Sequence, residues 1–422
     1  MDNKTKVLFL STFDNDLPGH AYSIMNSLPT DEYESRLFVL SNKYENTHFS
    51  LVGKGFFLKV YWFLLKVIQR IYVLFRFKIF PSVDKTHSEY CYFTNDFLPS
   101  YARIILRKLK GFNPDIISVH WVAGFVSSAT IRDLYKITGA KIVLCLIDQQ
   151  QMMGGCHYSI DCEGFTDGCF NCPALKKGKL LSHYQLENKK NNLCGIPIIL
   201  KGTPYDLRIA TTKSFLFKDK VCTTIRSIVR PNSIIKTPRQ TARKKFSIDN
   251  DKFVVLLGGA SVFERRKGIK YAIEAIHYAN ESINNLVVLL VGKINESELK
   301  YFEGIELVST GYLSMPDLFE AYCASNCYLS STIGDSGPVM VNFAIELGIP
   351  VVAFNVGISE TIVLHQKTGY IAEYKNSQDL ANGLIYIASL SEKAYSDMRN
   401  SCLQLLPELS KDEPWYQKVR KL

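Results

Sequence analysis

Short, continuously apolar runs recur along the chain and are separated by longer, mixed stretches. In the first half they cover residues 6–11, 36–40, 116–119, 142–146 and 198–200. The first run is followed by a turn-rich segment, residues 15–20, and then by an apolar-periodic stretch, which predicts strand, loop and helix. Because these runs stay apolar instead of alternating, they predict parallel strands that are buried on both faces.

The pattern breaks between residues 226 and 245, where Pro231 and Pro238 lie in a basic stretch without apolar periodicity. Such a stretch predicts an interdomain linker. The alternation then returns, with apolar runs at residues 253–257, 286–291, 305–308, 327–329 and 351–354. The expected fold class is α/β, with two doubly wound, Rossmann-like domains. Ligands of such sheets bind beyond the carboxyl ends of the strands, so we expect the site in a cleft that the two domains face.

These boundaries predict an N-terminal domain over residues 1–225, a linker over 226–245, a C-terminal domain over 246–405 and a tail over 406–422. The tail could pack back on the N-terminal domain. The length of 422 residues agrees with two domains, at about 150 residues each as a prior. With 47% hydrophobic and 21% charged residues, the composition excludes a disordered tail, a collagen repeat or a solenoid.

The charge and the cysteine content limit which binding partners and which cellular compartment are expected. Lys and Arg number 50 against 40 Asp and Glu, an excess of 10, which suits nucleotide phosphates, anionic lipid or nucleic acid. We expect no nucleic-acid partner, because the basic residues are dispersed and no recognition motif is present. The apolar stretch at residues 7–10 is too short for a signal peptide, and the 11 cysteines are an odd number and mostly scattered. The sequence therefore predicts a cytoplasmic protein.

Residues 332–353 form the most informative segment. Ser336 is expected to cap a helix that Pro338 opens and Gly348 closes, and the run at residues 349–354 is the next strand. A glycine-bearing turn that enters a helix offers free backbone N–H groups to a phosphate. The alternative is an ordinary tight loop of a βαβ unit.

A second loop, which follows the apolar run at residues 253–257, contains Arg265, Arg266, Lys267 and Gly268. Basic side chains after a strand of such a domain could bind phosphate. A solvated surface charge run is the alternative.

Asp335, the seven residues after it and the helix that ends in Gly-x-Pro-Val-Val-Ala resemble the E-x7-E region of family-four retaining glycosyltransferases. The similarity is to the subgroup that makes capsular and exopolysaccharides of the colanic-acid type. It implies the GT-B fold and a position for Asp335 beside the donor sugar. Phe343 replaces the second glutamate, which holds the ribose hydroxyls in that family, and a phenyl ring accepts no hydrogen bond. Glu346 could share that helix face or be a solvated surface residue.

The resemblance also implies a donor-binding group. A basic pair in the family grips the diphosphate, since negative charge grows on the leaving oxygen as the glycosidic bond breaks. Lys267 matches one member, and Arg266 or Arg265 would supply the other. Further donor-binding positions that the resemblance implies are Ser336, Gly337, Met340 and Val341.

On the acceptor side, His120 and Trp121 resemble the family's His-Trp strand end, and Gly19 belongs to the same side. A lone buried histidine is more often structural than catalytic. Asp148 matches a catalytic acid that follows a histidine in the subgroup. Ile147 replaces that histidine, which normally contacts the transferred sugar, and Gln150 stands where a tryptophan is expected.

Four cysteines lie within 17 residues and end in C-x2-C-P: Cys156, Cys162, Cys169 and Cys172. The spacing is ligand-like for a structural zinc ion, because four sulfur ligands leave no open position for catalysis. A reduced or disulfide-prone loop is the alternative. The Gly-Gly-Cys-His-Tyr and C-x2-C-P pattern is also the most specific resemblance to the polysaccharide subgroup. We expect no metal or other cofactor for catalysis.

Residues 55–80 alternate aromatic and aliphatic runs with basic residues, of which Lys59, Lys66 and Arg70 could share one helix face. A basic, aromatic amphipathic helix suits a membrane surface and a lipid-linked acceptor. Helices buried in an α/β domain look similar. No uncharged run reaches the roughly 18 residues that span a bilayer.

The sequence thus predicts an enzyme, a glycosyltransferase of the hexosyltransferase type (EC 2.4), peripheral on the inner face of the cell membrane. Its donor would be a UDP- or GDP-linked sugar, its acceptor a polysaccharide or lipid-linked glycan, and the transfer retaining. The alternative is a non-catalytic GT-B protein that binds glycan or partners another transferase, because Ile147 and Phe343 replace expected active-site residues. An NAD-linked dehydrogenase is excluded, since no G-x-G-x-x-G follows a strand.

Overall fold

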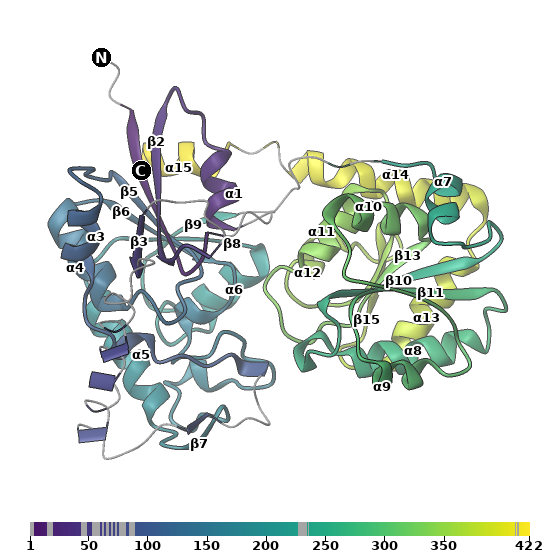
Figure 1. Cartoon of the computed structure of the whole chain (residues 1–422), viewed down its shortest axis with the longest axis horizontal. Coiled ribbons are helices and arrows are strands. Elements are labelled where there is room, and N and C mark those ends of the chain that lie inside the picture. Colours follow the sequence, from purple (N-terminus) through teal and green to yellow (C-terminus); the bar gives the residue numbers. More distant parts are fainter. Residues whose placement is uncertain are drawn as a thin grey trace. The chain divides into compact units, whose positions relative to one another are not determined.

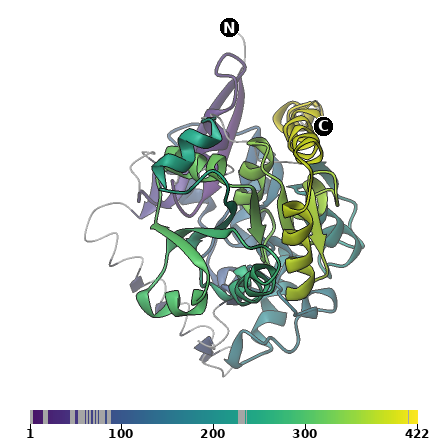
Figure 2. The ribbon, with the colours of Figure 1, turned by 90° about the vertical axis from the view of Figure 1, so that its right-hand side faces the viewer.

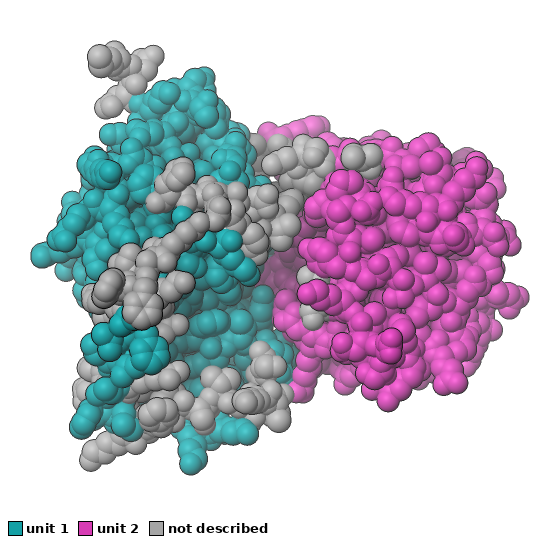
Figure 3. Space-filling view, viewed as in Figure 1, with its two compact units in different colours: residues 1–227, 413–422 teal, residues 228–412 magenta. Residues whose placement is uncertain are grey.

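The structure is a computed structural model, and it describes the chain in two compact units. The described residues are 4–14, 20–43, 49–52, 60, 63–64, 67–68, 71, 74–75, 82–83, 89–226, 234, 236–409, 411 and 413–422. Unit 1 comprises residues 1–227 and 413–422, and unit 2 comprises residues 228–412 (Figure 3).

Unit 1 is built on a seven-stranded parallel sheet in the order β3-β2-β1-β5-β6-β8-β9 (Figure 1). The strands are β1 (Thr5–Ser11), β2 (Tyr33–Ser41), β3 (Phe49–Val52), β5 (Ile116–Val119), β6 (Lys141–Leu146), β8 (Ile198–Gly202) and β9 (Thr223–Arg226). The helices are α1 (Ala21–Asn26), α3 (Ala102–Lys108), α4 (Ser128–Thr138), α5 (Leu181–Asn192), α6 (Pro204–Thr212) and α15 (Trp415–Lys421). A short pair, β4 (Ser82–Val83) with β7 (Leu175–Lys177), is antiparallel.

Both faces of this sheet are buried, as the continuous apolar runs predict. Along β1, Val7 and Phe9 point into a core shared with α1 and α15, whereas Leu8 and Leu10 point into a core shared with α3, α4 and α5. All four side chains are fully buried. At about 1.5–3 kcal/mol for each buried side chain, this strand alone contributes substantially to the stability of unit 1.

The last ten residues return to unit 1 through α15. The Trp415 ring meets Phe9 edge-on at 6.3 Å, and the Tyr416 ring meets Tyr33 at 5.2 Å. The Lys141 ammonium donates to the carbonyl oxygen of Val419 at 3.0 Å, close to the helix C-terminus, where a positive charge is favourable. These contacts fix the end of the chain against the sheet of unit 1.

Unit 2 has a six-stranded parallel sheet in the order β12-β11-β10-β13-β14-β15. The strands are β10 (Phe253–Ser261), β11 (Leu286–Lys293), β12 (Glu306–Gly311), β13 (Cys327–Ser330), β14 (Val351–Phe354) and β15 (Gly369–Ala372). The helices are α7 (Arg239–Lys245), α8 (Ile269–Asn280), α9 (Glu296–Leu299), α10 (Met315–Ala324), α11 (Val339–Glu346), α12 (Ser359–Ile362), α13 (Ser377–Ala388) and α14 (Glu392–Leu409). Helices α7, α10, α11 and α14 cover one face, and α8 and α13 cover the other (Figures 1 and 2).

Helix α7 lies inside the stretch that the sequence assigned to the linker. Its Arg243 is 2% exposed and donates five hydrogen bonds, to the carbonyls of Ala324, Asp249, Asn250 and Lys252 and to the Asn326 side chain. All the donors of this guanidinium are therefore satisfied, which anchors α7 in unit 2.

The predicted fold class is confirmed: each unit is a parallel sheet with helices on both faces, and every apolar run named above overlaps one of these strands. In both sheets the strand order reverses next to the first strand, between β1 and β5 and between β10 and β13. Such topological switch points are where doubly wound sheets bind ligands. Within the described residues, no helix is both long enough and apolar enough to cross a membrane.

Candidate functional site

The switch point of unit 2 gathers the charged residues that the sequence singled out. Arg266 and Lys267 belong to a short helical turn, η5 (Arg265–Lys267), that follows β10, and Asp335 follows the neighbouring strand β13. One Asp335 carboxylate oxygen lies 2.7 Å from an Arg266 guanidinium nitrogen and 2.5 Å from the Lys267 ammonium. The structure thus brings Asp335 together with Arg266 and Lys267, which lie 69 and 68 residues before it in the sequence.

Backbone contacts hold the two loops together. The Arg266 carbonyl accepts hydrogen bonds from the N–H groups of Ile333 and Gly334, and the Ser331 hydroxyl donates to the Lys267 carbonyl. Gly268 has a φ of 64°, and a Cβ there would meet the Ser331 carbonyl oxygen at 2.0 Å. Only glycine fits this close approach, which explains the Lys-Gly pair of the sequence.

Asp335 is ionised despite its burial. Burial raises the pKa of this carboxyl, but the charges and hydrogen bonds of Lys267 and Arg266 outweigh it and hold the pKa below its ordinary value. Arg266 is also gripped by Glu264, whose two oxygens lie 2.7 and 3.0 Å from its guanidinium. Two cations and two carboxylates therefore balance one another, and a negatively charged ligand would compete with the carboxylates for the same donors.

The helix after Asp335 begins differently from the prediction. The expected Ser336 cap is wrong: α11 starts at Val339 with Pro338 in the cap position, and no side chain caps it. Asp335 instead accepts a 3.3 Å hydrogen bond from the Gly337 N–H. The Ser336 hydroxyl is buried and has no hydrogen-bond partner among the described residues. A buried polar atom of this kind is a natural point of contact for a polar ligand.

The other residues that the resemblance assigned to the donor lie along α11. The Met340 carbonyl accepts a hydrogen bond from the Tyr322 hydroxyl at 2.7 Å. Val341 is fully buried and its N–H donates to the Pro338 carbonyl, so it offers no free polar group. Phe343 is 2% exposed and meets the ring of Phe319 edge-on at 5.4 Å. The position at which the sequence resemblance predicts a ribose-binding residue is therefore part of the hydrophobic core of unit 2.

In unit 1, His120 follows β5 at the switch point. Its Nε2 lies 3.0 Å from the Ser118 hydroxyl and 3.6 Å from the Cys145 sulfur. Burial, together with the positive charges of Lys201 and His20, lowers the pKa of His120 well below its ordinary value. The imidazole is therefore neutral at physiological pH.

Asp148 follows β6 and contacts His157, a residue to which the sequence assigned no role. Its carboxylate lies 2.6 Å from Nδ1 of His157, and the Trp121 indole N–H lies 2.9 Å from the same nitrogen. The Nε2 of His157 is buried and has no partner in the described part of the chain. The signal was present in the sequence, since His157 lies in the Gly-Gly-Cys-His-Tyr motif.

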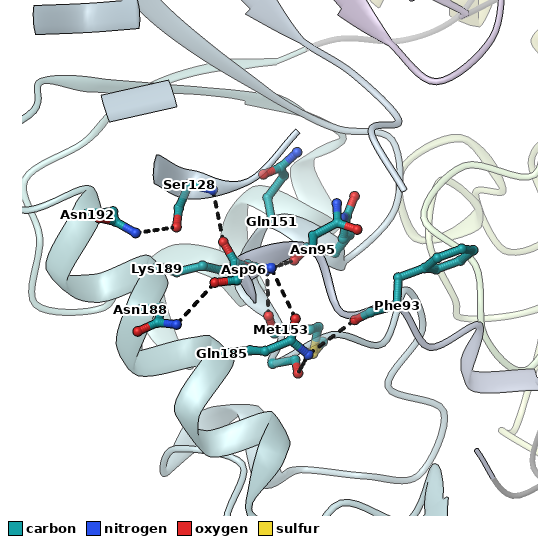
Figure 4. A network of polar contacts seen from close by, with 12 residues as sticks. Phe93, Asn95, Asp96, Ser128, Gln151, Met153, Gln185, Asn188, Lys189 and Asn192 are labelled. Carbon is teal, nitrogen blue, oxygen red and sulfur yellow. Dashed lines mark hydrogen bonds and ion pairs between the residues drawn. The ribbon is translucent and has the colours of Figure 1, made fainter. Parts of the chain in front are cut away.

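A buried polar network holds the loop after Asp148. Lys189 of α5 donates to the carbonyls of Gln150 and Met153 at 2.5 and 2.6 Å, and Gln185 of α5 donates to the carbonyl of Gly154 (Figure 4). Asp96 lies 3.7 Å from the Lys189 ammonium and offsets its charge. Gln150, at the position of the missing tryptophan, is buried in this loop, and Ile147 is partly buried before it.

The four predicted zinc ligands line one small cavity in the loop between Met153 and Ser182. Among the described residues, no group of three or more His, Cys, Asp or Glu side chains is arranged closely enough to hold a metal ion. Gly19 lies outside the described residues, as do Lys59, Lys66 and Arg70 of the basic aromatic segment.

Comparison with known proteins agrees with this architecture. Residues 238–402, within unit 2, match the family model described as glycosyl transferases group 1. No curated protein sequence matches the chain.

Similar solved structures cover almost the whole chain. They include sucrose-phosphate synthase from Thermosynechococcus elongatus, with a TM-score of 0.65, 13% identity and coverage of 99% of this chain and 97% of that chain. A glycosyltransferase from Rickettsia africae has a TM-score of 0.60, 14% identity and coverage of 99% and 97%. HepE from Anabaena, in complex with UDP and glucose, has a TM-score of 0.60, 16% identity and coverage of 99% and 100%. At such identities the likeness concerns the fold, and the chain has the GT-B fold.

Proposed function

We propose that this GT-B chain, whose second unit matches the group 1 glycosyltransferases, transfers a sugar from a nucleotide-diphosphate sugar to a glycan or lipid-linked acceptor. The observation that carries the proposal is the meeting of Arg266 and Lys267 with Asp335 at the switch point of unit 2. A transferase of this kind needs cations and a carboxylate in one site. The cations stabilise the departing diphosphate, which gains negative charge, and the carboxylate lies beside the sugar, which becomes cation-like.

The donor diphosphate would exchange partners with Asp335. Arg266 and Lys267 already point at one carboxylate oxygen, so phosphate oxygens that replace it require little rearrangement of either side chain. Asp335 would then be released to accept a hydrogen bond from a hydroxyl of the donor sugar. In this scheme the two cations stabilise the leaving group, and the chemistry proceeds without a catalytic metal and with retention.

The start of α11 would complete the phosphate site. The Ser336 hydroxyl has no hydrogen-bond partner in the described residues, and a phosphate oxygen is a suitable acceptor for it. The N–H groups of Gly337 and Met340 belong to the turn and the first helical residues, where the helix dipole favours negative charge. A UDP- or GDP-linked sugar fits this chemistry equally well.

The acceptor side is proposed to lie in unit 1, around Asp148, His120 and His157. Asp148 fixes the His157 ring through Nδ1 at 2.6 Å and leaves Nε2 without a partner in the described structure. A hydroxyl of the sugar or the acceptor could satisfy this nitrogen. His157 would thereby supply a polar contact in place of the histidine that Ile147 replaces.

We also propose that the protein acts in the cytoplasm, peripheral on the inner face of the cell membrane. Residues 53–83 contain six basic and no acidic residues. Most of the described apolar residues within this stretch are exposed, with Phe63 at 65% and Phe75 at 80%. Apolar side chains and positive charge together suit a surface of anionic lipid. Binding to vesicles that contain anionic lipid, weakening as salt rises, is expected; absence of binding at low salt would refute this location.

A second candidate is a non-catalytic GT-B protein that binds glycan or partners another transferase. It is favoured by the buried Phe343, which cannot anchor a ribose, and by the lack of a histidine at Ile147. The two candidates differ in whether the protein turns over a nucleotide sugar. A screen of UDP- and GDP-linked sugars, followed by nucleotide release and by calorimetric binding, separates an active transferase from a protein that binds glycan alone.

A further inference from the structure

The cysteine loop, residues 154–177, carries a feature that the proposed function does not use. It follows the short helical turn η3 (Gln150–Met152), and its own regular elements are the turn η4 (Gly164–Thr166) and the three-residue strand β7. Yet Cys156, Cys169 and Cys172 are buried, and the side chains of all four cysteines line one small cavity together with Tyr90 and Phe165.

One of the four sulfur atoms accepts a hydrogen bond from the loop backbone: the Gly164 N–H donates to the Cys162 sulfur at 3.4 Å. A neutral thiol is a weak acceptor, whereas a metal-bound thiolate carries negative charge and is oriented by such donors. The backbone at Cys162 is therefore arranged as it is around a thiolate ligand.

From these observations we propose that Cys156, Cys162, Cys169 and Cys172 bind one zinc ion in the cavity that they line. This proposal does not rest on the proposed transferase activity. The described side chains are not yet gathered around one point, so coordination requires the sulfurs to turn toward the cavity, to about 2.3 Å from the metal. Four thiolates complete a tetrahedral shell, so the ion would be structural and would have no open position for a substrate.

The local backbone supports a fixed arrangement of Cys169. Cys169 adopts a left-handed conformation with φ of 60°, which is uncommon for a non-glycine residue, and follows Gly168 with φ of 117°. Strained residues of this kind persist where the surroundings over-determine them. Bound zinc would supply that constraint, and it would tie down the segment that carries His157 beside Asp148.

Metal analysis of the full-length protein, purified without chelator from zinc-supplemented cells, tests the proposal. We expect about one zinc per chain, and substitution by cobalt should produce the charge-transfer absorption of thiolate coordination. The double variant C169S/C172S should lose the zinc. The control C194S, which changes an exposed cysteine outside the loop, should keep it.

Thiol titration of the native wild-type protein keeps the test decisive if the double variant fails to fold. In the zinc-loaded protein, addition of a chelator should raise the number of reactive thiols by about four. Two results would overturn the proposal: protein without zinc whose loop thiols react freely before chelator is added, or protein in which these cysteines form disulfides.

Discussion

The Lys267 ammonium lies 2.5 Å from the Asp335 carboxylate, although the two residues belong to loops after different strands of the unit 2 sheet. Arg266 reaches the same oxygen at 2.7 Å. Two cations and one partly buried carboxylate therefore lie together at the switch point of unit 2, where we propose that a diphosphate replaces the carboxylate.

Lys267→Ala should weaken the binding of UDP or GDP. A charge-assisted hydrogen bond to phosphate contributes about 1.5–3 kcal/mol, so calorimetry should show a loss of that order. The matched control is Lys252→Ala, which removes another lysine–carboxylate pair, Lys252 with Glu306 at 2.7 Å, at the start of β10 and away from the proposed site. Equal affinity in wild type and Lys267→Ala would refute the assignment of Lys267.

The stability that Asp335 contributes should depend on pH. Its folded-state pKa is lowered, so the contribution is present above the unfolded-state pKa of about 3.9 and is lost as pH falls through the folded-state value. Denaturation of wild type and Asp335→Asn should therefore show a difference in the free energy of unfolding that is largest near neutrality and shrinks below about pH 4. A difference that stays constant or grows on acidification would contradict the ionised state of Asp335.

Phe343→Glu should lower the melting temperature without strengthening nucleotide binding. The side chain is buried between Phe319 and Tyr322, and a carboxylate placed there without a partner costs several kcal/mol. Phe343→Leu, which stays apolar, is the control and should be much milder. Tighter nucleotide binding in Phe343→Glu with an unchanged melting temperature would mean that this face of α11 turns toward the ligand.

Arg243→Lys should destabilise unit 2. The arginine donates five hydrogen bonds, of which a lysine can make at most three, and the carbonyls that lose a donor stay buried. At about 1–3 kcal/mol for each buried group left unsatisfied, the melting temperature of this unit should fall by several degrees. Arg239→Lys, which alters a residue with one such bond, to Tyr395, is the control. Equal melting temperatures for the two variants would contradict a stabilising role for the five hydrogen bonds of Arg243.

The sequence predicted the central strands because their apolar runs are buried on both faces. It missed β3, β9 and β15, whose four-residue segments mix polar, aromatic and glycine residues with few continuous apolar positions. The basic, proline-containing stretch 226–245 predicted a linker. It contains α7, whose Arg243 donates to four carbonyls, a contact that no local pattern reveals.

The chain pattern predicted that ligands bind beyond the carboxyl ends of the strands, and the resemblance singled out Lys267 and Asp335, whose loops parallel strands bring to one edge. The prediction that Ser336 caps α11 was wrong because Pro338 occupies the cap position. Asp335 accepts the hydrogen bond of the Gly337 N–H instead. The role of His157 depends on a contact with Asp148 across a folded loop, so it required the structure.

Turnover of a nucleotide sugar by the wild-type protein tests the central claim most directly. Incubated with a panel of UDP- and GDP-linked sugars, the wild type should release nucleotide from at least one donor, and Lys267→Ala should lose most of this rate while Lys252→Ala keeps it. Wild-type protein that neither turns over nor binds any of these donors, while remaining folded, would contradict the transferase and leave the non-catalytic GT-B protein as the better account.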